Sequence, residues 1–429
     1  MTHTSSISRR TVTGSALLGT AALLLGAGGR AHAEPRAGAA PRTGTEPRAG
    51  ADPRARAAAF PAPGDLVPTL PAPTGRHRVG CQPLYLVDDS RRDPWDPAIP
   101  VRELMLTVFY PARDVTGLAP APQMPPQTAT WFGLITPHTP LHLPAAGVNW
   151  GATRSHAFEG ASPLPGRWPV LVHSPGGGDP RGLATSLAED LASHGAVVLT
   201  VDHPGDAAAV EFPDARPYRT DTVRTTVFRG DPRDQPAVAR TMIDARIADL
   251  HWVLDRLGRA ADLPLPRGLA ATLDLRRLGV YGHSAGGSAV TEVMYEDRRV
   301  RAGINLEGHL DYPPSAPGAA AEPFPVAKHG VDRPLLLLGS EGFDRREELD
   351  RSWSAVAAHS DRWVHSARVA DADHWTFTDY AAMLPQLQAA GLMTAAERKE
   401  LIGTVDPTAS VPEVRHTVRR FFARHLAGH

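Results

Sequence analysis

Short apolar runs recur along most of the chain, and they predict the strands of a sheet. Leu104, Leu106, Val108 and Tyr110 occupy every second position, which is the period of a half-buried strand. Pro111 is expected to end that strand, because proline cannot donate a hydrogen bond to a neighbouring strand. Further short apolar runs that predict buried strands are residues 168–173, 196–201, 278–281, 301–306 and 334–338.

Between these runs, apolar side chains recur at the three- and four-residue spacing of a helix. The strongest case is the series Ile243, Ile247, Leu250, Leu254 and Leu257. Helices are also predicted for residues 183–194, 289–294 and 414–426, and Gly195 is expected to stop the first of them. Strands that alternate with helices predict an α/β fold, with a mostly parallel central sheet and helices on both faces.

One long segment, residues 114–166, shows neither period. It is rich in Pro, Gly and Thr, yet it carries Trp131, Phe132 and Trp150. We therefore expect a long excursion over the domain without a regular element. Loops of this length are often lids or walls of binding sites.

The first 33 residues have the features of an export signal. Arg9 and Arg10 precede an apolar run over residues 16–27, and residues 31–33 fit a small-x-small cleavage site. The order resembles a twin-arginine signal, whose client folds before it crosses the membrane. The apolar run is too short to span a bilayer comfortably, so export with cleavage near Ala33 is favoured over an anchor.

Residues 34–63 follow as a predicted disordered linker. Within them a Pro-Arg pair recurs every six residues, and no large apolar side chain occurs until Phe60. Such a stretch cannot bury enough surface to offset its ordering entropy. The folded domain is therefore expected to cover residues 64–429.

Composition and charge exclude several classes of function. The 429 residues carry 45 Lys and Arg against 46 Asp and Glu, a balance that argues against a nucleic-acid partner. A hydrophobic fraction of 42% allows a sizeable core. The single cysteine, Cys81, excludes an internal disulfide and a cysteine-based zinc site.

The strongest chemical motif is Gly282-His283-Ser284-Ala285-Gly286. It matches the Gly-x-Ser-x-Gly nucleophile elbow and lies between a predicted strand and a predicted helix, as that motif requires. A sharp turn there would expose the Ser284 hydroxyl in a strained conformation. The backbone N–H that follows, that of Ala285, would donate to an oxyanion.

A serine hydroxyl needs a base to accept its proton, and in this chain order the base comes later in the sequence. His374 is the favoured candidate, because its polar loop follows the last core strand. The competing histidines are His309, His329, His359 and His365.

The third group must be an acid that orients the imidazole. Glu307 ends the strand directly after the nucleophile unit, whereas Glu341 and Asp344 follow the next strand. Motif order alone leaves both loops open.

Several short motifs carry a family resemblance over roughly residues 75–426. They are Val108-Phe109-Tyr110-Pro111, His173-Ser174-Pro175-Gly176-Gly177, Ala192-Ser193-His194-Gly195, Val201-Asp202-His203-Pro204-Gly205, Gly282-His283-Ser284-Ala285-Gly286-Gly287, Asn305-Leu306-Glu307-Gly308 and His374-Trp375-Thr376-Phe377-Thr378-Asp379. The sequence resembles the platelet-activating-factor acetylhydrolase branch of the α/β-hydrolases, including its secreted actinobacterial relatives. The resemblance implies Glu307 as the acid, although that family usually has Asp there. It also implies Gly177 as the second oxyanion donor, and short acyl chains on lipid-like or aryl alcohols.

Together these features predict a secreted serine carboxylic-ester hydrolase that works through an acyl-enzyme with Ser284, His374 and Glu307. We expect no metal or other cofactor, a small-molecule or lipid ester substrate, no nucleic acid, no membrane anchor after signal cleavage, and a monomer. The turn of Asp202, His203 and Asp206 is expected to shape the pocket wall rather than bind metal. Three alternatives stay open: a serine peptidase or amidase, a polyester hydrolase, and a non-catalytic extracellular binding protein.

Overall fold

The computed structural model describes residues 61–316 and 318–427. The predicted signal peptide, residues 1–33, lies outside the described residues, as does the predicted linker up to residue 60. Residues 61–63 belong to no helix or strand. Shortly afterwards Leu66 forms a bridge with Val148, which joins the start of the described chain to the rest of the fold.

A mixed eleven-stranded sheet forms the centre of the fold, in the order β15-β14-β11-β10-β6-β7-β2-β1-β4-β3, with β5 paired to β2. Its strands are β1 Arg78–Asp88, β2 Arg102–Asp114, β3 Pro120–Pro122, β4 Arg154–Glu159, β5 Ser162–Pro163, β6 Trp168–Ser174, β7 Val197–Val201, β10 Leu273–His283, β11 Val300–Leu306, β14 Leu335–Ser340 and β15 Val364–Val369. From β15 to β7 every pair is parallel, and β2 is antiparallel to both β7 and β1. The predicted mostly parallel sheet is confirmed.

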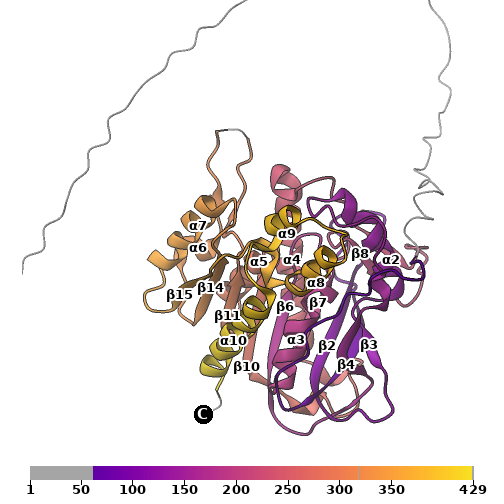
Figure 1. Cartoon of the computed structure of the whole chain (residues 1–429). Coiled ribbons are helices and arrows are strands. Elements are labelled where there is room, and N and C mark those ends of the chain that lie inside the picture. Colours follow the sequence, from indigo (N-terminus) through magenta and orange to yellow (C-terminus); the bar gives the residue numbers. More distant parts are fainter. Residues whose placement is uncertain (1–60, 317, 428–429) are drawn as a thin grey trace, which may run out of the picture. The chain divides into compact units, whose positions relative to one another are not determined.

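Helices cover both faces of this sheet. One face carries α4 Pro236–Leu257, α5 Ala285–Glu296, α6 Pro325–His329 and α7 Arg346–Ala358, and the other carries α3 Thr185–Ser193 and α10 Pro407–His425. Figure 1 shows α3 and α10 next to each other along the strands. Successive side chains of β14 divide between the two faces: Leu335 and Leu337 belong to the first core, Leu336 and Leu338 to the second.

A third apolar cluster lies beside the carboxyl ends of the parallel strands. It joins α2 Pro126–Ile135 to α8 Tyr380–Ala389 and α9 Ala395–Ile402, which are far apart in sequence. Two small hairpins complete the strands, β8 Ala209–Glu211 with β9 Val223–Thr225, and β12 Asp311–Tyr312 with β13 Glu322–Pro323. Single 3-10 turns are η1 Thr136–His138, η2 Trp150–Ala152, η3 Arg181–Ala184, η4 Pro232–Asp234, η5 Ala260–Asp262, η6 Ala270–Thr272 and η7 His374–Phe377.

The prediction that Pro111 ends its strand is wrong, since β2 continues to Asp114. The N–H and C=O of one strand residue point to the same side, and the Pro111 carbonyl accepts a 2.8 Å hydrogen bond from Leu164 N–H. The Pro111 nitrogen, which has no hydrogen to donate, therefore faces away from β1. On that side of β2, β7 pairs only with residues 106–109 and so does not reach Pro111. The proline removes no bond between β1 and β2.

The prediction that residues 114–166 hold no regular element is also wrong. The segment contains α2, with Pro126 at its first turn, and β4, which pairs parallel to β1. The side chains that β4 buries are the small ones of Ser155 and Ala157. Because these buried side chains are small or polar, the sequence of β4 does not show the alternation of large apolar and polar residues that would have predicted a strand.

Across residues 61–316 and 318–427, every helix is too short or too polar to cross a membrane.

Candidate active site

Ser284 lies in a sharp turn between β10 and α5. β10 ends at His283, α5 begins at Ala285, and Ser284 between them has φ 52° and ψ −123°. A positive φ is strained for a residue with a Cβ, and such strain is concentrated at functional sites. A Cβ on Gly286 would come within 2.0 Å of the Ser174 carbonyl oxygen, so this side of the turn has room only for glycine.

His374 begins η7, shortly after β15, and its ring is held from two sides. Its Nδ1 lies 2.9 Å from Glu307 Oε2, and the ring of Phe343 stacks on it at 4.6 Å between centroids. Its backbone carbonyl accepts a 2.9 Å hydrogen bond from His283 Nε2. With Nδ1 occupied, Nε2 is the nitrogen left for a substrate or nucleophile.

Glu307 directly follows β11 and is fully buried, with 0% exposure. Its second carboxylate oxygen, Oε1, accepts hydrogen bonds from both the N–H and the hydroxyl of Ser340. Burial alone would raise the pKa of Glu307. The hydrogen bonds from His374 and Ser340, together with the charge of His374, outweigh burial and hold the pKa below its usual value. The carboxylate is therefore ionised when it faces the His374 ring.

Of the candidate acids Glu307, Glu341 and Asp344, only Glu307 forms a hydrogen bond with the His374 ring within the described residues. Glu341 and Asp344 are exposed, and Asp344 lies on the rim of the cavity. Among the competing histidines, His329, His359 and His365 are exposed, whereas His309 is buried in the cavity wall.

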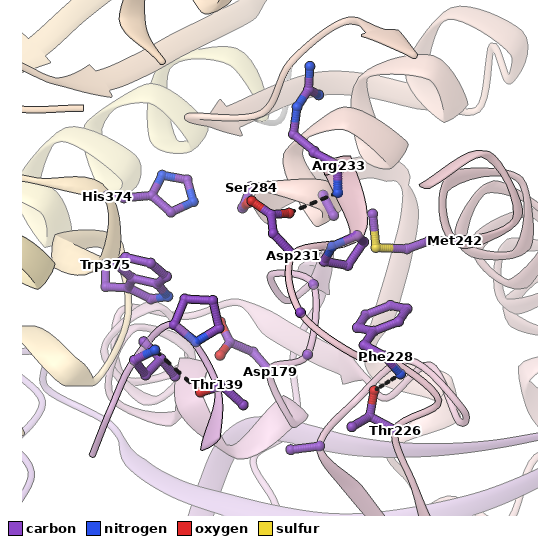
Figure 2. A pocket seen from close by; sticks show the side chains of 18 of the residues that line it. Thr139, Asp179, Thr226, Phe228, Asp231, Arg233, Met242, Ser284, His374 and Trp375 are labelled. Atoms are coloured by element: carbon purple, nitrogen blue, oxygen red, sulfur yellow. Dashed lines mark hydrogen bonds between the residues drawn. The ribbon is translucent and has the colours of Figure 1, made fainter. Parts of the chain in front are cut away.

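Ser284 and His374 open onto one cavity of about 840 Å³. Figure 2 shows Ser284 between His374 and Met242 among the residues that line that cavity, with Trp375 beside His374. Within the described part of the chain, no hydrogen bond joins the two side chains. Bonds between catalytic groups are often long or misaligned before a substrate binds.

Gly177 and Ala285, the predicted oxyanion donors, line the same cavity as Ser284. Ala285 is the first residue of α5, so its N–H has no partner inside the helix. A Cβ on Gly177 would be 3.8 Å from that of Ala285, which places the two backbones close together. Neither N–H makes a hydrogen bond within residues 61–316 or 318–427.

The walls of the cavity differ in character from one end to the other. The 114–166 segment contributes Trp131, Leu134, Ile135 and Leu141, which are apolar and partly exposed. The charged residues Asp231, Arg233 and Arg345 lie on another part of the wall. The cavity can thus hold an apolar group next to Ser284.

The turn after β7 lies behind this cavity, and its polar side chains are hydrogen-bonded. His203 bonds to Ser174 and Asp249, Asp202 accepts from the Arg181 N–H, and Asp206 pairs with Arg246. Within the described residues no group of three or more His, Cys, Asp or Glu side chains is arranged to hold a metal ion.

Sequence reasoning assigned no role to Ser340 or Arg246. Ser340 ends β14 at the same sheet edge as the other site residues, which is the signal that could have identified it. Arg246 follows Ile243 by three residues and precedes Leu250 by four, so it lies on the inward face of α4. Charged side chains are rarely fully buried unless they are paired, so an arginine at a core position of the sequence indicates a specific role.

The chain is similar to proteins that are named as esterases or acetylhydrolases. The family model described as platelet-activating factor acetylhydrolase, isoform II, matches residues 67–222. A probable 1-alkyl-2-acetylglycerophosphocholine esterase of Arthroderma benhamiae is 26% identical over 381 residues, covering 84% of this chain and 88% of the relative. A platelet-activating factor acetylhydrolase of Cavia porcellus is 25% identical over 43% of each chain. The solved ferulic acid esterase of Streptomyces cinnamoneus is 34% identical, with a TM-score of 0.64, over 84% of this chain and 94% of that one.

Proposed function

This chain belongs to the α/β-hydrolase esterases of the platelet-activating-factor-acetylhydrolase type, and on that premise we propose that Ser284, His374 and Glu307 are its catalytic triad. The observation that carries the proposal is the 2.9 Å contact between Glu307 and His374 Nδ1, in the cavity that also holds the strained Ser284. Nucleophile, base and orienting acid are the three parts that such an enzyme needs.

In the proposed mechanism Ser284 Oγ attacks the ester carbonyl carbon while His374 Nε2 accepts its proton. Glu307 holds the Nδ1 proton and stabilises the imidazolium that forms. The N–H groups of Gly177 and Ala285 donate to the oxyanion. His374 then returns the proton to the leaving alcohol, and water hydrolyses the acyl-enzyme by the same steps, which release the acid and free Ser284.

The substrate we propose is a short-acyl ester of a lipid-like or aryl alcohol. Apolar side chains of the 114–166 segment support this choice, because they offer contact to an apolar group. The name of one similar protein, a probable 1-alkyl-2-acetylglycerophosphocholine esterase, is consistent with an acetyl ester of a lipid-like alcohol. The name of the other, a ferulic acid esterase, points to an aromatic acyl group rather than to an aryl alcohol.

Turnover of p-nitrophenyl acetate by the full-length chain tests the proposal directly. We expect hydrolysis by the wild type and a loss of at least about 10³-fold in kcat for Ser284→Ala. Ser366→Ala, an exposed serine on β15, is the matched control and should retain full activity. An inactive wild type would refute the esterase assignment for this substrate class, and an active Ser284→Ala would refute the nucleophile. Faster cleavage of p-nitroacetanilide than of the ester would favour an amidase.

We also propose that the enzyme is exported by the twin-arginine pathway and released after cleavage near Ala33. The support is the sequence order of Arg9 and Arg10, the short apolar run and the small residues at 31–33.

A further inference from the structure

The loop that contains Gly177, residues 174–179, is held from behind by a buried arginine. Arg246 of α4 is 0% exposed, and its guanidinium donates to the Pro175 carbonyl at 2.5 Å and to the Gly176 carbonyl at 2.9 Å. Arg246 does not line the cavity, whereas Gly177 does. The guanidinium and the cavity therefore lie on different sides of the loop.

Two hydrogen bonds to the Gly176 carbonyl, from Arg246 at 2.9 Å and from the Asp179 N–H at 3.1 Å, fix where the next N–H points. That carbonyl and the Gly177 N–H belong to one peptide unit, which is planar and trans, so they point in opposite directions. When Arg246 holds the carbonyl on the buried side, the Gly177 N–H must point away from Arg246. A charged donor on the carbonyl also polarises the peptide, which makes its N–H a stronger donor.

Asp206 completes this arrangement. Its Oδ2 accepts a 2.6 Å hydrogen bond from Arg246 Nε, and its Oδ1 accepts a 2.9 Å bond from the Gly178 N–H. Asp206 therefore fixes the guanidinium, balances its buried charge and binds the N–H that follows Gly177. Among the three consecutive glycines, the N–H of Gly178 is committed to the scaffold and that of Gly177 is not.

A second brace holds the start of the loop. Ser174 Oγ lies 2.9 Å from His203 Nε2, and His203 Nδ1 lies 3.0 Å from Asp249 Oδ2. Burial, together with the charge of Arg246, lowers the pKa of His203, so the neutral ring donates from Nδ1 and accepts the Ser174 proton at Nε2. All three residues are buried, so this Ser-His-Asp chain positions the loop and has no access to substrate.

We propose that Arg246, fixed by Asp206, is the positioning residue of the oxyanion hole: it holds the Gly176 carbonyl so that the Gly177 N–H faces the developing oxyanion. The inference rests on the proposed function and adds a residue to it. It requires that Arg246 act on the transition state more than on substrate binding, because the oxyanion exists only after attack.

Arg246→Met tests this in the full-length chain. We expect kcat for p-nitrophenyl acetate to fall roughly tenfold to hundredfold, less than the 10²–10³ typical of deleting a donor, with KM changed less than about threefold. The Ki of an aryl trifluoromethyl ketone, whose Ser284 adduct carries an oxyanion, should rise by the same factor as kcat falls. Arg246→Lys should recover part of both, since an ammonium can still reach one carbonyl.

Two further variants separate positioning from general damage. Asp206→Asn keeps one acceptor oxygen near the loop, replaces the other by an NH2 group and removes the charge that fixes Arg246, so a smaller loss with the same pattern is expected. Arg333→Met is the matched control, because Arg333 is also buried and donates to the carbonyls of Met294, Asp297 and Val300. It should lower the melting temperature without changing the ratio of kcat to Ki.

The proposal is overturned if folded Arg246→Met keeps wild-type kcat, or if it loses kcat while Ki stays constant. If Arg246→Met does not fold, Asp206→Asn decides by the same criterion. An inactive wild type, or an active Ser284→Ala, would instead refute the proposed function.

Discussion

At the scale of single residues, the site depends on backbone conformations that residues other than glycine rarely adopt. Ser284 has φ 52° and Glu307 has φ 61°, and each follows the end of a neighbouring parallel strand. The Ser284 N–H donates to the Leu306 carbonyl at 2.8 Å, which ties the two turns together. The strained turns bring the proposed nucleophile and the proposed acid to one edge of the sheet, where hydrogen bonds between neighbouring strands can hold them.

Replacing Glu307 with Gln tests the acid at this scale. The amide would present either a donor or a weaker acceptor to His374 Nδ1, so the ring would lose the tautomer that leaves Nε2 free to accept a proton. We expect kcat for p-nitrophenyl acetate to fall about 10³–10⁴-fold, as for an Asp→Asn change in other triads. Asp344→Asn, an exposed rim residue, should keep activity within about twofold. The reverse result would assign the acid to the loop after β14.

At the scale of elements, the helix that begins next to Ser284 also carries an unusual buried acid. Glu292 of α5 is 2% exposed; Oε2 accepts a 3.1 Å bond from the Val326 N–H at the start of α6, and Oε1 has no partner among the described residues. Burial raises the pKa of Glu292 to about 7. Its charged form is therefore disfavoured in the folded state.

This raised pKa predicts a pH-dependent gain from Glu292→Gln. Because the folded pKa lies above the unfolded one, the wild type loses stability as pH rises from about 4.5 to 7, by up to about 3 kcal/mol. Glutamine resembles the protonated acid at every pH. The free energy of unfolding in urea should thus favour the variant increasingly between pH 4.5 and pH 8.

The control for this measurement is Glu296→Gln, at an exposed position one turn later in α5. It should not reproduce the growing advantage. A difference between Glu292→Gln and wild type that stays constant from pH 4.5 to pH 8 would show that the acid is already ionised in the folded state.

The sequence identified elements where burial produces a period, and missed them where it does not. The inward side chains of α4 and α10 are large and regularly spaced, so both helices were predicted. β15 is largely exposed along its length, and β4 buries only small side chains. Their strand conformation depends on pairing with β14 and β1, which no local pattern records.

At the scale of the whole molecule, the site gathers the ends of strands from across the chain. Gly177 follows β6, Ser284 follows β10, Glu307 follows β11, and His374 comes after β15. Parallel strands bring all of these ends to one edge, which is the usual position of a site in such sheets. The 114–166 segment and α8 then pack in one apolar cluster beside that edge and complete the wall of the cavity.

Export is the prediction that concerns the chain as a whole. Changing Arg9 and Arg10 to Lys should abolish secretion in a bacterial host that has the twin-arginine pathway, because the receptor reads the guanidinium pair as well as its charge. Esterase activity should remain inside the cell, on a chain that keeps residues 1–33. Activity in the medium and the N-terminal sequence of the released protein are the measurements.

The matched control changes Arg36 and Arg42 to Lys, the same chemical change within the predicted linker. Secretion of that variant should be normal. Unchanged secretion of the Arg9 and Arg10 variant would mean that another pathway exports the chain.

The sequence by itself determined the parts that depend on local order. The strand-Gly-x-Ser-x-Gly-helix arrangement predicted Ser284 as the nucleophile, the polar loop downstream of the predicted strands favoured His374 as the base, and the alternation of predicted strands and helices predicted the mostly parallel sheet. It left the acid open, because Glu307 and Asp344 both follow strands and local patterns contain no distances between them. Only the tertiary structure decided that Glu307 reaches His374, that residues 114–166 form part of the sheet and the cavity wall, and that Arg246 lies behind Gly177. These facts depend on which strands pair and which faces pack, and those contacts join residues far apart in the chain.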